Sequence, residues 1–118
     1  MLPNVYSLIT GDATAAAIVG NRVYRHGMAP QDVALPYVTW FVPSAAMENT
    51  LSEQPKVDAY SVQVDVWSDS DAGVEHAAKA VRNAIEPHHY MTLVSNGRDP
   101  DTMRYRISMT FTFWTDRD

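Results

Sequence analysis

Two stretches in the second half of the chain alternate between apolar and polar residues. In residues 57–67 the even positions from Tyr60 are apolar, and in residues 103–115 the odd positions from Tyr105 to Phe113 are apolar. Successive side chains of a β-strand point to opposite faces of a sheet, so each stretch predicts a strand with one apolar face. This pattern is typical of an antiparallel sheet that helices cover on one side.

The segment between these two strands has the period of a helix. Asp69, Ser70 and Asp71 form a strong helix start, in which Ser70 is interpreted as a cap and not as a nucleophile. Pro87 ends the predicted helix. The apolar residues on one face of it are Val74, Ala77, Ala78, Val81 and Ile85.

The first part of the chain predicts a helix that is broken in the middle. Residues 4–19 read as helical, but Gly11 and Asp12 interrupt the apolar pattern. Asp12 can cap a second short piece, which ends at Gly20. A kinked or broken first helix is the expected result.

The remaining segments predict further strands and their connections. Residues 22–25 are a short β-prone run, and residues 36–42 are dense in β-branched and aromatic residues. Residues 43–55 show neither the period of a helix nor that of a strand, so they predict a long loop or an extended hairpin tip. Residues 90–94 predict a short strand, and residues 95–102 predict turns because they contain Asn-Gly and Asp-Pro.

The predicted order of elements is α-β-β-β-α-β-β, within a single domain that spans residues 1–118. Short connections between consecutive strands favour hairpins. We therefore expect an α+β fold, with a mainly antiparallel sheet of four to five strands and two helices packed on one face.

Composition narrows the possible functions. The chain has 118 residues and no cysteine, which excludes disulfides, thiolate catalysis and cysteine-based zinc sites. Its net charge of −5 argues against a surface that grips nucleic acid. It has no apolar run of the ~20 residues that a membrane span needs and does not begin like a signal peptide, so we expect the chain to be made in a cytoplasm and to stay there.

The candidate catalytic groups each have a structural interpretation. Adjacent His88 and His89 point apart on an extended segment and are a poor chelating pair. Asp58 and Asp65 are seven residues apart on one strand, so they do not form an acid–base pair. The glycines are scattered and form no phosphate loop. We expect no catalytic residue, no metal and no cofactor.

The aromatic and basic side chains are the features of the sequence that suggest an interface. Trp67 and Trp114 are out of phase with the apolar faces of their strands, as expected of side chains that lie under a loop or contact a partner. Arg104 and Arg106 suggest salt bridges or a subunit contact. The predicted interface residues, which include three from the long loop, are Trp67, Trp114, Met47, Glu48, Leu51, Arg104 and Arg106.

Several short motifs, in this order and spacing, resemble the tail-completion or tail-terminator family of long-tailed bacteriophages and prophages. They cover nearly the whole chain. The motifs are VGNRVY (residues 19–24), APQ (29–31), LPYV (35–38), VQVDVW (62–67) and FTFW (111–114).

The resemblance implies a structural protein of the virion, located at the head–tail interface. Such subunits close into a hexameric ring that ends the tail tube and joins it to the head connector. The implied partners are further copies of the chain, the tail tube protein and the head-completion protein, while DNA passes through the lumen without specific binding. The alternative is a small α+β enzyme or ligand-binding domain with a site in a dimer cleft, using His88, His89 or the arginines.

Overall fold

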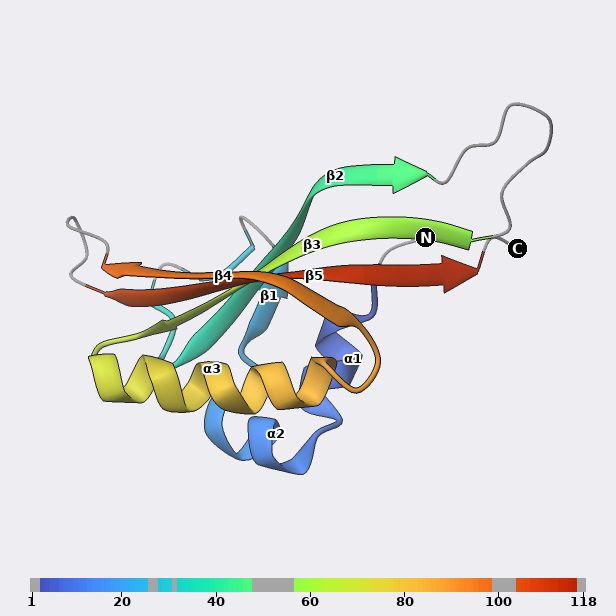
Figure 1. Cartoon of the computed structure of the whole chain (residues 1–118). Coiled ribbons are helices and arrows are strands. Elements are labelled where there is room, and N and C mark those ends of the chain that lie inside the picture. Colours follow the sequence, from blue (N-terminus) through green and yellow to red (C-terminus); the bar gives the residue numbers. More distant parts are fainter. Residues whose placement is uncertain (1–2, 26–27, 31, 48–56, 99–103, 117–118) are drawn as a thin grey trace, which may run out of the picture.

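The computed structural model describes residues 3–25, 28–30, 32–47, 57–98 and 104–116 (Figure 1). Three helices lie beneath one face of a five-stranded sheet, and none of the described helices covers the other face, which we call the open face. In chain order the elements are α1 (Val5–Thr10), α2 (Ala13–Val19), β1 (Val23–Arg25), β2 (Tyr37–Met47), β3 (Val57–Ser68), α3 (Asp71–Ile85), β4 (Tyr90–Arg98) and β5 (Tyr105–Asp116). The α+β class and the helical layer on one face are therefore confirmed.

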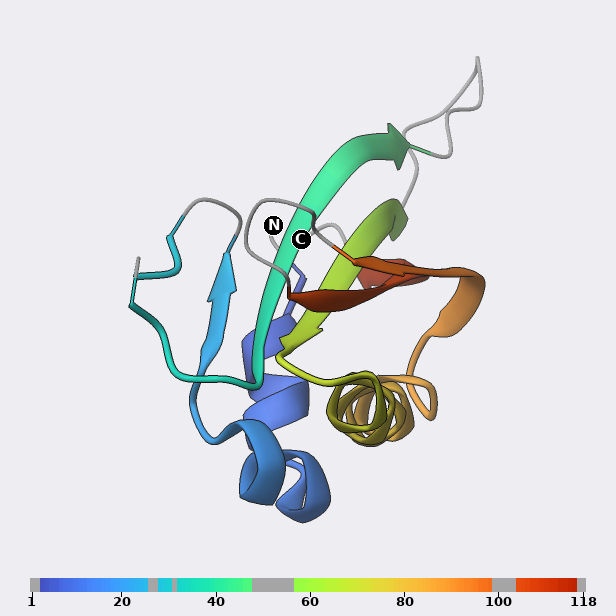
Figure 2. The same ribbon diagram turned by 90° about the vertical axis from the view of Figure 1, so that its left-hand side faces the viewer.

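The sheet is mainly antiparallel, as expected, but one pair of consecutive strands, β1 and β2, is parallel and makes the sheet mixed. Its order is β1-β2-β3-β5-β4, and the pairs β2–β3, β3–β5 and β5–β4 are antiparallel. β1 instead pairs with β2 in parallel, with Val23 opposite Val38. The connection from Arg25 to Tyr37 returns the chain to the end where β1 began, so these two strands cannot form a hairpin. Figure 2 shows β1 and β4 at opposite margins of the sheet.

The first helix breaks at the predicted position, so the fold has three helices and not two. The carboxylate of Asp12 accepts a hydrogen bond from the backbone N–H of Ala15 at 2.9 Å, which caps α2. Gly20 ends α2 with a φ of 60°, a conformation that favours glycine. In the described part of the chain, no helix has the length and apolar character that crossing a membrane requires.

The core lies between α3 and the middle of the sheet. The second half of β3 and the second half of β5 bury their apolar positions, as the alternation predicts, and so does the predicted stripe of α3. Tyr105 and Ile107, at the start of β5, are only partly buried. Phe111 and Phe113 are fully buried and meet edge to face, with ring centroids 6.5 Å apart. Val5 and Ile9 of α1 complete the cluster.

Two strands are longer than predicted because pairing overrides local turn signals. β2 continues past Pro43 to Met47, after an irregularity between Phe41 and Ser44 that accommodates a residue without an N–H donor. β4 continues to Arg98, and its Asn-Gly pair lies opposite β5 instead of in a turn. The rest of the predicted loop, residues 48–55, and the Asp-Pro pair at 99–100 lie outside the described residues.

A substitution at the N-terminal cap of α3 tests how much this cap stabilises the fold. Ser70 accepts a hydrogen bond from the N–H of Gly73 at 3.0 Å, and Ser70→Ala removes that acceptor. We expect the free energy of unfolding to fall by about 1 kcal/mol, measured by urea denaturation. Ser7→Ala, at an exposed position inside α1, is the matched control and should leave stability nearly unchanged. Equal losses in both variants would contradict the capping role.

Candidate functional site

The open face of the sheet carries two aromatic rings and two arginines, which we call the arginine–aromatic cluster: Tyr37, Trp67, Arg104 and Arg106. Trp67 of β3 lies opposite Tyr37 of β2 and also opposite Arg106 of β5. Three neighbouring strands therefore place these side chains in one row across the sheet. Arg104, just before β5, joins them by contacting Tyr37. The structure thus brings together three of the residues that the sequence singled out.

The contacts within the cluster hold both guanidinium groups over aromatic rings. The rings of Tyr37 and Trp67 stack, with centroids 6.0 Å apart and planes inclined by 9°. The indole N–H of Trp67 donates to the hydroxyl of Thr39 at 3.0 Å. Arg104 lies 5.6 Å from the ring centroid of Tyr37 and donates to its hydroxyl at 3.0 Å. Arg106 lies 5.5 Å from the ring of Trp67, and such cation–π contacts orient the charged groups.

Burial makes the base of the cluster rigid and leaves one charge at the surface. Tyr37 is only 6% exposed, Trp67 and Arg104 are half-buried, and Arg106 is exposed. Asp65, which lies next to Trp67 on the same face of β3, is buried and accepts a hydrogen bond from Gln63 at 3.0 Å. Guanidinium groups held in this way can bind a carboxylate or a phosphate, but arginine, tyrosine and tryptophan supply no general base at neutral pH.

The other predicted interface residues do not join this cluster. Trp114 lies eight residues beyond Arg106 on β5, which corresponds to about 26 Å along an extended strand. Met47 pairs with Asp58 at that same far end of the sheet. Glu48 and Leu51 lie outside the described residues. The predicted interface is therefore divided between two ends of the molecule.

Sequence reasoning missed Tyr37 and Thr39. Both lie in the part of β2 that was predicted as a strand, but nothing in the local pattern says which residue of β3 lies opposite each of them. The out-of-phase position of Trp67 was the available signal, because a tryptophan on the polar face needs an apolar neighbour and a hydrogen-bond partner. The register of β2 against β3 supplies both.

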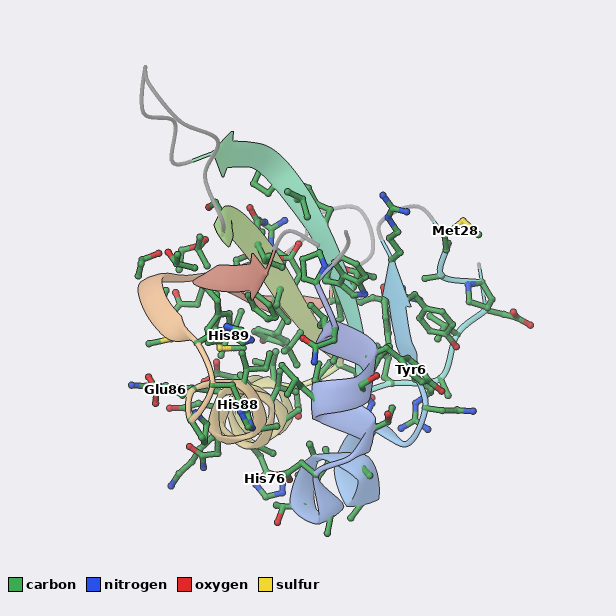
Figure 3. The ribbon with its side chains drawn as sticks, turned by 90° about the vertical axis from the view of Figure 1, so that its right-hand side faces the viewer. Tyr6, Met28, His76, Glu86, His88 and His89 are labelled. Carbon is green, nitrogen blue, oxygen red and sulfur yellow. The ribbon has the colours of Figure 1, made fainter. Side chains whose placement is uncertain are left out.

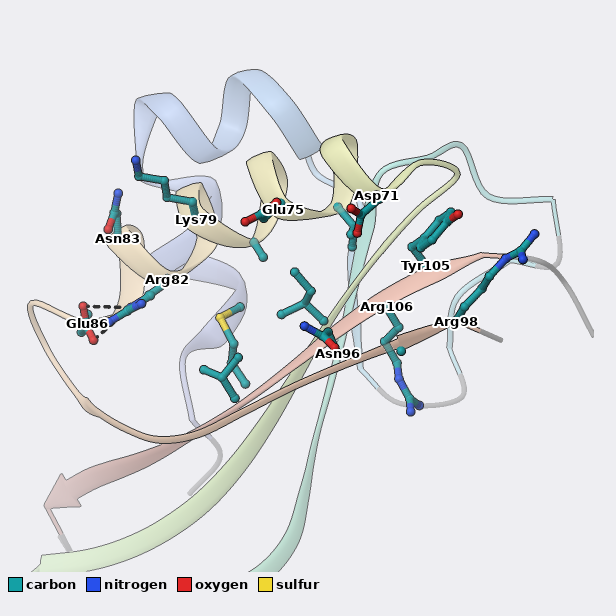
Figure 4. A pocket seen from close by; sticks show the side chains of 16 residues that line it. Asp71, Glu75, Lys79, Arg82, Asn83, Glu86, Asn96, Arg98, Tyr105 and Arg106 are labelled. Atoms are coloured by element: carbon teal, nitrogen blue, oxygen red, sulfur yellow. Dashed lines mark hydrogen bonds and ion pairs between the residues drawn. The ribbon is translucent and has the colours of Figure 1, made fainter. Parts of the chain in front are cut away.

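A groove of about 870 Å³ lies between α3 and β4, on the helical side of the sheet (Figure 4). Val94, Ile107 and Met109 contribute apolar lining to it. Charged side chains of α3 form its rim, where Arg82 and Glu86 pair with each other at 3.2 Å. The groove combines an apolar base with charges of both signs.

The histidines do not assemble into a metal site within the described residues, which hold no group of three potential ligands. His89 instead stacks on Phe113, with ring centroids 3.7 Å apart and planes inclined by 16°. Its Nδ1 is buried and has no hydrogen-bond partner among the described residues. Burial, and to a smaller extent the charge of His88, lowers the pKa of His89 below 6.5 (Figure 3).

This lowered pKa predicts that the fold loses stability in mild acid. The unfolded chain takes up a proton at His89 at a higher pH than the folded chain, so unfolding is favoured as the pH falls below about 6.5. We expect the free energy of unfolding to decrease between about pH 8 and about pH 5, and His89→Gln to reduce that dependence. His76→Gln, at an exposed position of α3, is the control and should leave the dependence in place. An identical pH profile in His89→Gln and the parent chain would contradict this assignment.

Comparisons with known proteins point to one kind of assembly. The family model described as "Tail completion protein gp17" matches residues 3–116. A solved structure described as "Virion of native gene transfer agent (GTA) particle" contains a chain with the same fold, at a TM-score of 0.79 and 21% sequence identity. The match covers 96% of this chain and 92% of that one. No curated protein matches the chain.

Proposed function

Because the chain belongs to the tail completion protein gp17 family, we propose that it closes the end of a tail tube as a hexameric ring and joins it to the head connector. Family membership makes the chain a structural tail protein of a phage-like virion and not an enzyme, which overturns the enzymatic alternative. The observation that carries the proposal is the match along residues 3–116, because it includes every described helix and strand. Ring closure and the identity of the partners are the proposed parts.

The arginine–aromatic cluster is the proposed contact with another virion protein. Its exposed guanidinium, Arg106, is held over Trp67 at 5.5 Å, so little side-chain freedom remains to be lost on binding. Tryptophan, tyrosine and arginine are the residue types that contribute most to binding energy in protein interfaces. The two arginines give this cluster positive charge, although the chain as a whole carries a net charge of −5. A positive patch favours a partner with a complementary acidic surface. We therefore assign an acidic face of the tail tube or connector protein to this cluster.

The direct test is assembly with tail tubes. Purified chain is mixed with tubes built from the tail tube protein of the same particle, and bound chain is measured by sedimentation. Electron microscopy of the tube ends then counts the subunits in each cap. We expect one ring at one end of each tube and an end to tube growth. A chain that neither binds tubes nor limits their length would refute the proposal.

A further inference from the structure

The two margins of the sheet carry the most exposed large apolar side chains among the described residues. Tyr6 is 48% exposed and Met28 is 71% exposed, and both lie on the β1 side (Figure 3). Val94 is 46% exposed and belongs to β4, the opposite edge strand. Single exposed apolar residues are ordinary, but here they occupy the two ends of the strand order.

The two margins present different surfaces. On the β4 side, Val94 lines the groove beneath α3, whose volume is about 870 Å³. On the β1 side, Tyr6 projects from α1, and Met28 follows β1 and is tied to it by a backbone hydrogen bond to Arg25 at 2.9 Å. We call the side chains of Tyr6, Arg25, Met28 and Asp32 the β1 ridge; all four are exposed.

Both margins carry charged groups of both signs. The β1 ridge has one positive group, Arg25, and one negative group, Asp32. The lining of the groove has the acidic Asp71 and Glu75 and the basic Lys79 on α3, and the basic Arg98 on β4. Arg82 and Glu86 already pair within the chain, so they need no partner from outside. Each margin can therefore offer either sign of charge to the other, beside its exposed apolar side chains.

We propose that the β1 ridge of one copy seats in the α3–β4 groove of the next copy. This inference rests on the proposed ring, and it names the two surfaces that close it. Two different surfaces in contact form a heterologous interface, which is the kind that generates a ring. Because β1 and β4 lie at opposite margins, one copy can use both surfaces at once, and the open sheet face stays available to another virion protein.

Cysteine cross-linking tests this pairing on a favourable background, because the chain has no cysteine of its own. Met28→Cys and Val94→Cys each place one thiol at one margin. The variants are treated with a short bifunctional maleimide, separately and as an equal mixture, both free and bound to tail tubes. We expect cross-linked dimers only in the mixture, and a ladder up to the closed ring when one chain carries both changes. Ala17→Cys, exposed on α2, replaces either partner as the control and should give no product.

The outcomes separate this inference from the proposed function. Rings on tube ends without cross-linking in the mixture would overturn the ridge-and-groove pairing and leave the tail-capping function standing. Efficient cross-linking of either single variant with itself would also overturn it, because that requires a symmetric contact. A chain that forms no ring and binds no tube would overturn the proposed function, and the pairing with it.

Discussion

Replacing Phe111 by alanine is expected to lower the free energy of unfolding by about 3–5 kcal/mol, the largest effect of any substitution considered. The ring is fully buried, and it meets Phe113 edge to face with centroids 6.5 Å apart. Alanine removes the apolar contacts and leaves a cavity beneath α3 that the surrounding strands cannot fill. Since small domains have a total stability of about 5–15 kcal/mol, much of the population should unfold under mild denaturation.

Urea denaturation monitored by tryptophan fluorescence measures this loss. Tyr6→Ala is the matched control, because it also removes an aromatic ring but from a position that is 48% exposed. We expect the control to lose less than about half as much stability, because about half of the Tyr6 side chain is already in water and its removal opens no buried cavity. The loss of stability in Phe111→Leu should lie between those of Phe111→Ala and Tyr6→Ala, since leucine fills part of the volume of the ring. Equal losses for Phe111→Ala and Tyr6→Ala would show that Phe111 is not a centre of the core.

Reversing the charge of Arg106 is expected to weaken binding to tail tubes or connector by at least about tenfold. The side chain is exposed and lies over Trp67, so Arg106→Glu should leave the fold intact while placing a negative charge where an acidic partner docks. Sedimentation of the chain with each partner across a salt series measures the affinity. The defect should shrink as the salt concentration rises, because ions screen the repulsion.

Two substitutions at the same site serve as controls for this prediction. Arg106→Lys keeps the charge and should retain most of the binding, whereas Arg106→Gln should be intermediate. Thermal unfolding of all three variants checks that the fold is preserved. If Arg106→Glu bound both partners normally and altered only the retention of DNA, the cluster would face the lumen, and the assignment to a protein partner would be wrong.

The local elements were predictable because their signals are carried by neighbouring residues. The alternation through β3 and β5, the stripe of α3 and the cap at Asp12 each depend on a few adjacent positions, and the structure confirms all of them. The extension of β4 through Asn96 and Gly97 was not predictable in this way. Its backbone pairs with β5, and that pairing outweighs the preference of Asn-Gly for a turn.

By itself, the sequence determined the class of the fold, the faces of its main strands and helix, and the motif order that places the chain in a tail completion family. The fold class and the faces follow from side-chain periodicity and local capping, which any stretch of about ten residues expresses. The family follows instead from the likeness of the ordered motifs to those of known members. The tertiary structure alone decided the parallel pairing of β1, the meeting of Tyr37 with Trp67 and Arg106, and the opposite placement of ridge and groove. Those features depend on strand register and order, which join residues far apart in the chain; the out-of-phase Trp67 indicates that a partner exists but not which residue it is.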